Sequence, residues 1–257
     1  MKILVCGNLG YIGPTLCKHL KSNFKKSTIV GLDTGFFSSC ITTTERLGDT
    51  YCDNQIYMDI RDVDLDFYSK FDSIVLLSAI SNDPMGKKFE KITDQINHIA
   101  TIKIIENYLK LPNKNVIFAS SCSVYGAGGN KAKTEIDTIN PLTAYARSKI
   151  AVEKVLQDVD YGINSIATSL RFATACGMSD RLRLDLVLND FVASAILNKK
   201  IVVLSDGSPW RPLININDMA RAIEWAIIRK KFQNDSYIAV NVGSKNWNFT
   251  VRQLAES

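Results

Sequence analysis

The sequence predicts an α/β fold built on a doubly wound parallel sheet. Short apolar runs bounded by turn residues alternate with stretches of helical periodicity, as expected for β-α-β units. The predicted strands are Ile3–Cys6, Thr28–Leu32, Ser73–Ser78, Asn115–Ala119 and Ser165–Arg171, and the predicted helices cover about 12–22, 88–109 and 143–159. With 46% apolar residues among 257, the chain can bury a substantial core.

The pattern changes after residue 172. The predicted elements are a helix around 184–198, a strand Ile201–Leu204, a turn-rich stretch Ser205–Pro212, a helix over 217–230 and a strand Ile238–Val242. We expect residues 1–172 to form the main domain. Residues 173–257 are expected to form mainly a small part over the carboxyl edge of the sheet, where open α/β folds bind ligands, with some segments returning to the sheet. The final FTVRQLAES begins a helix, so this small part is either naturally short or truncated.

Charge and hydropathy exclude several classes of partner. The 31 basic and 26 acidic residues leave a net charge of +5, and the basic residues occur in ones and twos. This scatter indicates a solvated surface and no nucleic-acid partner. No stretch approaches 18 apolar residues, so we expect no membrane association and a cytoplasmic protein.

The six cysteines show no metal-site or disulfide pattern. They stand at positions 6, 17, 40, 52, 122 and 176 without a C-x-x-C motif, and the chain has two histidines. We therefore predict neither a metal site nor a disulfide framework.

A glycine-rich turn follows the first predicted strand. Gly7, Gly10 and Gly13 form G-x-x-G-x-x-G directly before a helix, so backbone N–H groups and the positive helix end could approach a pyrophosphate. A plain tight turn would explain the glycines alone. However, Asp33 ends the second predicted strand 20 residues past Gly13, where a carboxylate accepts hydrogen bonds from ribose hydroxyls and repels a 2′-phosphate. Together these features predict a Rossmann-type domain that binds NAD rather than NADP.

Tyr145 and Lys149 are spaced to share one face of a helix. A cation beside a phenol favours the phenolate, and half-ionisation of tyrosine at neutral pH needs roughly 4 kcal/mol of preferential stabilisation. Lys149 and a nicotinamide charge together could supply it. The strand Asn115–Ala119 opens into Ser120-Ser121-Cys122-Ser123, whose hydroxyls could hold a substrate oxygen beside the tyrosine or simply cap the loop.

With these residues assembled, the chain resembles the extended short-chain dehydrogenase/reductase family, especially its nucleoside-diphosphate-sugar epimerases and dehydratases. The likeness runs along the whole chain. It rests on GNLGYIG, Asp33, YMDIRD, LLSA at 76–79, SSCSVYG, Tyr145-x-x-x-Lys149 and SDGSPWRPLININDMA at 205–220.

The resemblance implies roles for individual residues. The implied cofactor-binding residues are Gly7, Gly10, Tyr11, Ile12, Gly13, Asp33, Asp59, Ile60, Leu77, Ser78, Ala79, Tyr145 and Lys149, with Asp59-Ile60 on the adenine. The implied catalytic set is Ser121, Tyr145 as acid/base and Lys149. The implied substrate contacts are Ser121, Ser123, Tyr145, Thr174 and Arg211, with Arg211 on the substrate diphosphate.

Two departures affect the implied activity. Related 4,6-dehydratases carry Asp-Glu where this chain has Cys122-Ser123, so dehydration is disfavoured. Thr174 stands where relatives have an asparagine that helps to bind the diphosphate. Cys122 is expected to be packed rather than nucleophilic, because no histidine neighbours it in the sequence.

The function expected from the resemblance is an NAD-dependent nucleotide-sugar epimerase, acting at C4 through a transient 4-ketosugar. The alternatives are an NAD-dependent ketosugar reductase or dehydrogenase of a small hydroxy compound, and a non-catalytic dinucleotide-binding module. Relatives dimerise through helices corresponding to about 88–109 and 143–159, which implies a homodimer. The substrate expected is a nucleoside-diphosphate sugar.

Overall fold

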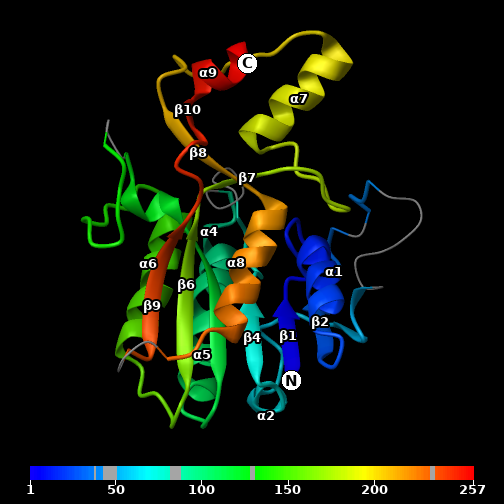
Figure 1. Cartoon of the computed structure of the whole chain (residues 1–257), viewed down its shortest axis with the longest axis vertical. Coiled ribbons are helices and arrows are strands. Elements are labelled where there is room, and N and C mark those ends of the chain that lie inside the picture. The colour runs from blue at the N-terminus through cyan, green and yellow to red at the C-terminus, as the bar shows by residue number, and fades with distance from the viewer. Residues whose placement is uncertain (38, 43–50, 82–87, 128–130, 232–234) are drawn as a thin grey trace.

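The computed structural model describes residues 1–37, 39–42, 51–81, 88–127, 131–231 and 235–257. Its centre is a seven-stranded parallel sheet with helices on both faces, in the order β3-β2-β1-β4-β5-β6-β9 (Figure 1). The strands are β1 (Lys2–Cys6), β2 (Thr28–Asp33), β3 (Asn54–Tyr57), β4 (Ser73–Leu76), β5 (Asn115–Ser121), β6 (Ile166–Phe172) and β9 (Tyr237–Val242). This strand order is that of a Rossmann-type sheet, which confirms the predicted fold class.

The helices flank the sheet and extend above it. They are α1 (Gly13–Asn23), α2 (Leu65–Ser69), α4 (Glu90–Asp94), α5 (Thr101–Tyr108), α6 (Ala144–Asp158), α7 (Val187–Asn198), α8 (Ile216–Ile228) and α9 (Val251–Glu256), with a π-helical turn η2 (Gln95–Ala100) and a 3₁₀ turn η3 (Cys122–Tyr125). A small second sheet has the order β10-β8-β7 and contains β7 (Thr174–Cys176), β8 (Trp210–Asn215) and β10 (Asn248–Thr250).

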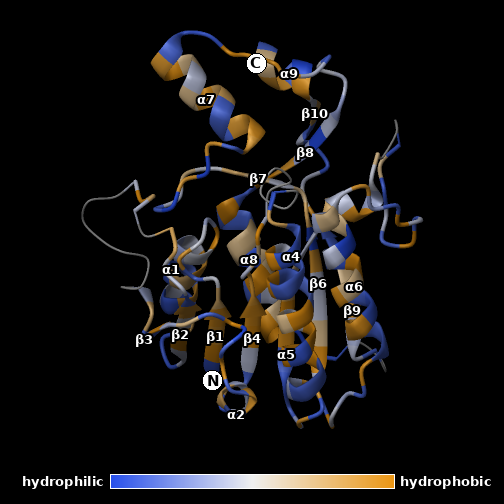
Figure 2. Cartoon of the chain, turned by 180° about the vertical axis from the view of Figure 1, so that it is seen from behind, coloured by the Kyte–Doolittle hydropathy of each residue, from blue (hydrophilic) through white to orange (hydrophobic). Residues whose placement is uncertain are grey.

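Side chains of the parallel strands alternate between two apolar layers. In β1, Ile3 and Val5 pack with α1 and α8 on one face, whereas Leu4 and Cys6 pack with α5 and α6 on the other. Both faces of the sheet are therefore covered, which explains why its strands read as continuous apolar runs. Figure 2 shows β1, β2 and β4 largely in the colour of apolar residues. A third cluster joins α7, α9 and β8 above the sheet.

One prediction in the carboxyl-terminal part is wrong, and a second is correct only in part. Residues Ile201–Leu204 do not form a strand. Their alternation is nevertheless present, because Ile201 and Val203 pack against the third cluster while Leu204 is 96% exposed, but the segment pairs with no described strand. The stretch Ser205–Pro212 is not entirely a turn, since Trp210–Pro212 open β8 and pair with β10. Strand β9, by contrast, returns to the central sheet beside β6.

Candidate active site

The glycine loop sits between the carboxyl ends of β1 and β4 and cannot accept larger residues. Gly7 has φ +87°, and a Cβ placed there would lie 2.6 Å from the backbone nitrogen of Ser78. A Cβ on Gly13 would lie 2.1 Å from the carbonyl oxygen of Asn8. Both glycines therefore let the loop pack closely against neighbouring backbone directly before α1, where backbone N–H groups and the helix end can meet a pyrophosphate.

Asp33 lies beside this loop at the end of β2. Its carboxylate accepts hydrogen bonds from the backbone N–H of Leu9 (3.2 Å) and of Gly35 (2.9 Å). Burial raises the pKa of Asp33, although these backbone hydrogen bonds oppose the change. Each carboxylate oxygen keeps lone-pair capacity for a further donor such as a ribose hydroxyl. The glycine cradle and this carboxylate fit the adenosine diphosphate half of NAD.

The remaining predicted cofactor residues surround this region. Asp59 pairs with Arg61 at 2.8 Å, which lowers the pKa of Asp59. Ile60 is buried, and Ile12 lies directly before α1. The Leu77 N–H donates to the Cys6 carbonyl (2.9 Å), which holds the end of β4 against β1.

Two predicted residues lie where the chain leaves β4. The backbone of Ser78 packs directly against Gly7, and the next residue, Ala79, is half-buried. Asn97, in the π-helical turn η2, holds the segment after β4 in place. Its Oδ1 accepts a hydrogen bond from the Ile80 N–H (2.8 Å), and its Nδ2 donates to the Ile80 carbonyl (2.9 Å). Asn97 was not predicted as a site residue, because its only signal in the sequence is that of a polar residue within a helical pattern.

The predicted acid/base pair lies on α6, whose first turn is capped by the hydroxyl of Thr143. Lys149 is 4% exposed, and its Nζ lies 5.3 Å from the centroid of the Tyr145 ring and 4.7 Å from that of Phe118. Burial lowers the pKa of Lys149 to about 8, while the charge of Glu153 opposes the change. The structure therefore brings the cation and the phenol ring together, as the spacing predicted.

Ser121 ends β5, the strand that carries Phe118 beneath Lys149. Its Oγ accepts a hydrogen bond from the backbone N–H of Ser123 (3.2 Å). The buried Oγ of Ser123 finds no hydrogen-bond partner in the described part of the chain. Burial raises the pKa of the Cys122 thiol, which agrees with a packed side chain rather than a nucleophile.

The two predicted diphosphate contacts lie on the second sheet. Thr174 on β7 is paired with Leu213 on β8, and Arg211 stands two residues before Leu213. Arg211 is exposed, and one guanidinium nitrogen donates to the Trp210 carbonyl at 2.9 Å. Its positive charge opposes the rise that burial causes in the pKa of Cys122, which follows β5.

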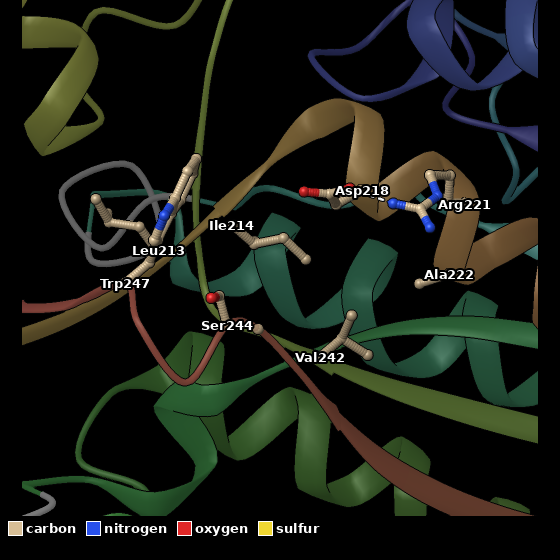
Figure 3. Close-up of a pocket in the computed structure, with 9 residues that line it drawn as sticks. Leu213, Ile214, Asp218, Arg221, Ala222, Val242, Ser244 and Trp247 are labelled. Atoms are coloured by element: carbon tan, nitrogen blue, oxygen red, sulfur yellow. Dashed lines mark hydrogen bonds and ion pairs between the residues drawn. The ribbon is translucent and has the colours of Figure 1, made fainter.

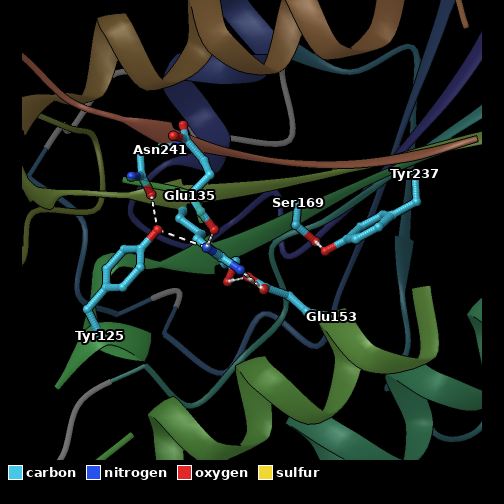
Figure 4. Close-up of polar contacts among 8 residues, drawn as sticks. Tyr125, Glu135, Glu153, Ser169, Tyr237 and Asn241 are labelled. Atoms are coloured by element: carbon cyan, nitrogen blue, oxygen red, sulfur yellow. Dashed lines mark hydrogen bonds and ion pairs between the residues drawn. The ribbon is translucent and has the colours of Figure 1, made fainter. Parts of the chain in front are cut away.

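A buried polar network behind the acid/base pair was not predicted (Figure 4). Glu153, one helical turn after Lys149, accepts hydrogen bonds from Ser120 (2.5 Å) and from Arg171, whose Nη2 lies at 2.7 Å. Arg171 also donates to the Tyr125 hydroxyl (2.8 Å), which donates to Asn241 on β9 (2.6 Å). The network ties α6 to the strand end that carries Ser121.

A separate pocket of about 540 Å³ opens between α8, β8 and the turn after β9 (Figure 3). It is lined by Leu213, Ile214, Asp218, Arg221, Ala222, Val242, Gly243, Ser244 and Trp247. None of the predicted site residues lines it.

In the described residues, no three His, Cys, Asp or Glu side chains gather where they could share a metal ion. Likewise, none of the described helices has the length and apolar character needed to cross a membrane.

The geometry agrees with comparisons to known proteins. Residues 3–243 match the NAD dependent epimerase/dehydratase family. The chain belongs to this family. That membership confirms the predicted relationship and the predicted cofactor, NAD.

Three relatives illustrate the range within the family. A putative UDP-glucose 4-epimerase of Methanocaldococcus jannaschii is 27% identical over 86% of this chain and 71% of its own length. The UDP-glucuronic acid 4-epimerase of Bacillus cereus, solved with UDP-glucuronic acid and NAD, is 25% identical with a TM-score of 0.80 over 98% of this chain and 80% of its own. TunA, an NAD-dependent NDP-hexosamine 5,6-dehydratase of tunicamycin biosynthesis, shares the fold with 19% identity and a TM-score of 0.82, over 98% of this chain and 78% of its own.

Proposed function

We propose that the chain is an NAD-dependent nucleotide-sugar epimerase that acts at C4 through a transient 4-ketosugar. The observation that carries this proposal is the buried Lys149 ammonium beside the Tyr145 ring, on the helix that packs against the strand ending in Ser121. NAD⁺, when bound, takes up a hydride from the sugar carbon and can return it. The protein must therefore move a proton, orient the sugar and exclude competing reactions.

The proton is assigned to Tyr145. As a phenolate it removes the proton from the sugar hydroxyl, and as a phenol it returns the proton after the 4-ketosugar has presented its other face. Lys149 favours the phenolate through its charge and would hold the nicotinamide ribose. By the resemblance, Ser121 and Ser123, at and just after the end of β5, orient the sugar, while Arg211 and Thr174 bind the diphosphate.

The residues after Ser121 favour epimerisation over dehydration. Elimination of water needs an acid and a base beside the tyrosine, but these positions hold Cys122 and Ser123. The raised pKa of Cys122 leaves the thiol protonated at neutral pH, so it does not replace a carboxylate base. The runner-up is a net oxidoreductase with the same residues, which external turnover of NAD(H) would distinguish.

The remaining assignments follow the same proposal. Residues 1–172 would bind NAD and carry the acid/base pair, and residues 173–257 would mainly bind substrate. The protein would act in the cytoplasm. A homodimer through α4–α5 and α6 is supported by three exposed apolar side chains in or directly before α4 and η2: Phe89, Ile92 and Ile99.

The test is Tyr145→Phe, which removes one hydroxyl. We expect turnover of nucleotide sugars to fall at least about 100-fold while bound NAD is retained, measured by product NMR and by NAD released on denaturation. The matched control is Tyr161→Phe, because Tyr161 lies beyond the end of α6 and its hydroxyl donates to the carbonyl of Leu156 in the last turn of that helix. Full turnover by Tyr145→Phe would contradict the assignment.

A further inference from the structure

Residues 177–189, in the small carboxyl-terminal part, contact the segments that follow three neighbouring strands, β2, β1 and β4. We call the carboxyl ends of these three strands, where the glycine loop and Asp33 lie, the cofactor edge. After β7 the chain runs across the carboxyl edge of the sheet toward the segment after β2 (Figure 1). It bonds Tyr11 after β1, Thr42 after β2 and Ser81 after β4. These are the strand ends between which the glycine loop and Asp33 lie. We call residues 177–189 the crossing segment.

Tyr11 provides the most buried of these contacts. Although it belongs to the glycine loop, its hydroxyl points to the crossing segment and donates to the Gly177 carbonyl (2.7 Å). Its own carbonyl accepts a hydrogen bond from Ser179 Oγ (2.6 Å). Tyr11 is 6% exposed and Ser179 is 4% exposed, so neither bond is readily replaced by water.

Asn189, on the first turn of α7, completes this contact. Its Oδ1 accepts from the Gly177 N–H (3.0 Å), and its Nδ2 donates to the Tyr11 hydroxyl (3.2 Å) and to the Arg183 carbonyl (3.0 Å). The amide thereby uses both N–H groups and its oxygen. Because the Asn189 and Tyr11 side chains are both buried, loss of the bond between them leaves a polar group without a partner.

Two weaker contacts lie on either side. Arg183 donates to the hydroxyl of Ser81 (2.8 Å), two residues after Ala79. Thr42 donates to the Ser179 carbonyl (2.9 Å), and its N–H donates to the Asp180 carbonyl (2.8 Å). These outer groups are more exposed, so the Tyr11–Asn189 contact is the one whose loss would release the segment.

We propose that Tyr11 and Asn189 are positioning residues that latch the crossing segment across the cofactor edge and thereby retard the release of NAD. With the latch closed, the segments after β1, β2 and β4 are held together, and a dinucleotide spanning them cannot leave without breaking these bonds. Because the inference concerns the family's cofactor, it does not depend on whether the sugar reaction is epimerisation.

The test measures cofactor exchange rather than activity. Protein loaded with NAD is mixed with an excess of isotopically labelled NAD, and the bound dinucleotide is followed by mass spectrometry. Tyr11→Phe should exchange NAD about tenfold faster than the parent chain. The matched control is Tyr108→Phe, whose buried hydroxyl donates to a backbone carbonyl, that of Phe71, at 3.0 Å and away from the cofactor edge. It should exchange NAD at the parent rate.

Two further measurements test whether Tyr11 and Asn189 hold the crossing segment in place. Amide hydrogen exchange in residues 177–183 should accelerate in Tyr11→Phe, while β5 remains protected. If the latch acts as a unit, the double variant Tyr11→Phe/Asn189→Ala should release NAD no faster than Asn189→Ala alone. Equal exchange by Tyr11→Phe and Tyr108→Phe, or additive effects in the double variant, would overturn the proposal. If Tyr145→Phe kept full turnover while NAD exchange responded to Tyr11→Phe as predicted, the proposed sugar reaction would be wrong and the proposed role of Tyr11 and Asn189 would stand.

Discussion

Replacing Lys149 with methionine should stabilise the fold while removing the cation that the proposed chemistry needs. Lys149 is 4% exposed, and burial lowers its pKa from 10.5 to about 8. At about 1.4 kcal/mol per pKa unit, the folded state at pH 7 carries a cost of about 3 kcal/mol for keeping this group charged. Methionine has a similar length and no charge, so the variant should be more stable by about that amount.

The difference in stability between Lys149→Met and the parent protein should decrease as pH rises. Between pH 8 and 10.5 the unfolded chain binds a proton at Lys149 that the folded chain has released, so the parent protein gains stability as pH rises through this window. The advantage of Lys149→Met should therefore shrink from about 3 kcal/mol at pH 7 to about 1 kcal/mol at pH 10. Titrating groups that do not interact with Lys149 are common to both proteins and cancel in the difference.

Urea unfolding of the NAD-free proteins, followed by circular dichroism at pH 7, 8.5 and 10, measures this difference. The matched control is Lys154→Met, an exposed lysine of the same helix, for which we expect a change within about 0.5 kcal/mol at every pH. A Lys149→Met protein that is less stable than the parent at pH 7, or an advantage that does not decline with pH, would refute the reasoning.

Three further predictions follow from the site. Gly13→Ala places a Cβ 2.1 Å from the Asn8 carbonyl oxygen, so calorimetry should show NAD affinity reduced at least about 100-fold; unchanged affinity would contradict the described loop. Glu153→Gln leaves the buried Arg171 charge unpaired and should lower the free energy of unfolding by about 3 kcal/mol in urea, whereas a loss below about 0.5 kcal/mol would indicate a solvated pair. Arg211→Ala should weaken binding of UDP about tenfold and leave NAD affinity unchanged; equal loss of both would disprove a diphosphate-specific role.

The sequence predicted the parts of the fold that depend on local patterns. The buried strands have continuous apolar runs, and the glycine loop followed by Asp33 has a fixed spacing, so both were found correctly. Ile201–Leu204 shows the limit of such patterns: the alternation was real, but a strand also needs a neighbour with which to pair. Whether that neighbour exists is decided by the tertiary structure.

The same distinction applies to the site. Tyr145 and Lys149 are four residues apart on one helix, so their proximity followed from helical geometry. Glu153 and Arg171 lie on different elements and meet only because α6 packs over the sheet, and no spacing rule predicts that pair. Likewise, the motif placed Tyr11 in the cofactor loop, but only the structure shows its hydroxyl directed at Gly177.

The most direct test of the proposed function is to incubate the purified chain with UDP-, dTDP-, GDP- and CDP-sugars, following absorbance at 340 nm and identifying products by NMR. We predict a C4 epimer of one of these sugars without net formation or consumption of NADH. Net NADH turnover, or a dehydrated 4-keto-6-deoxy product, would contradict the epimerase assignment.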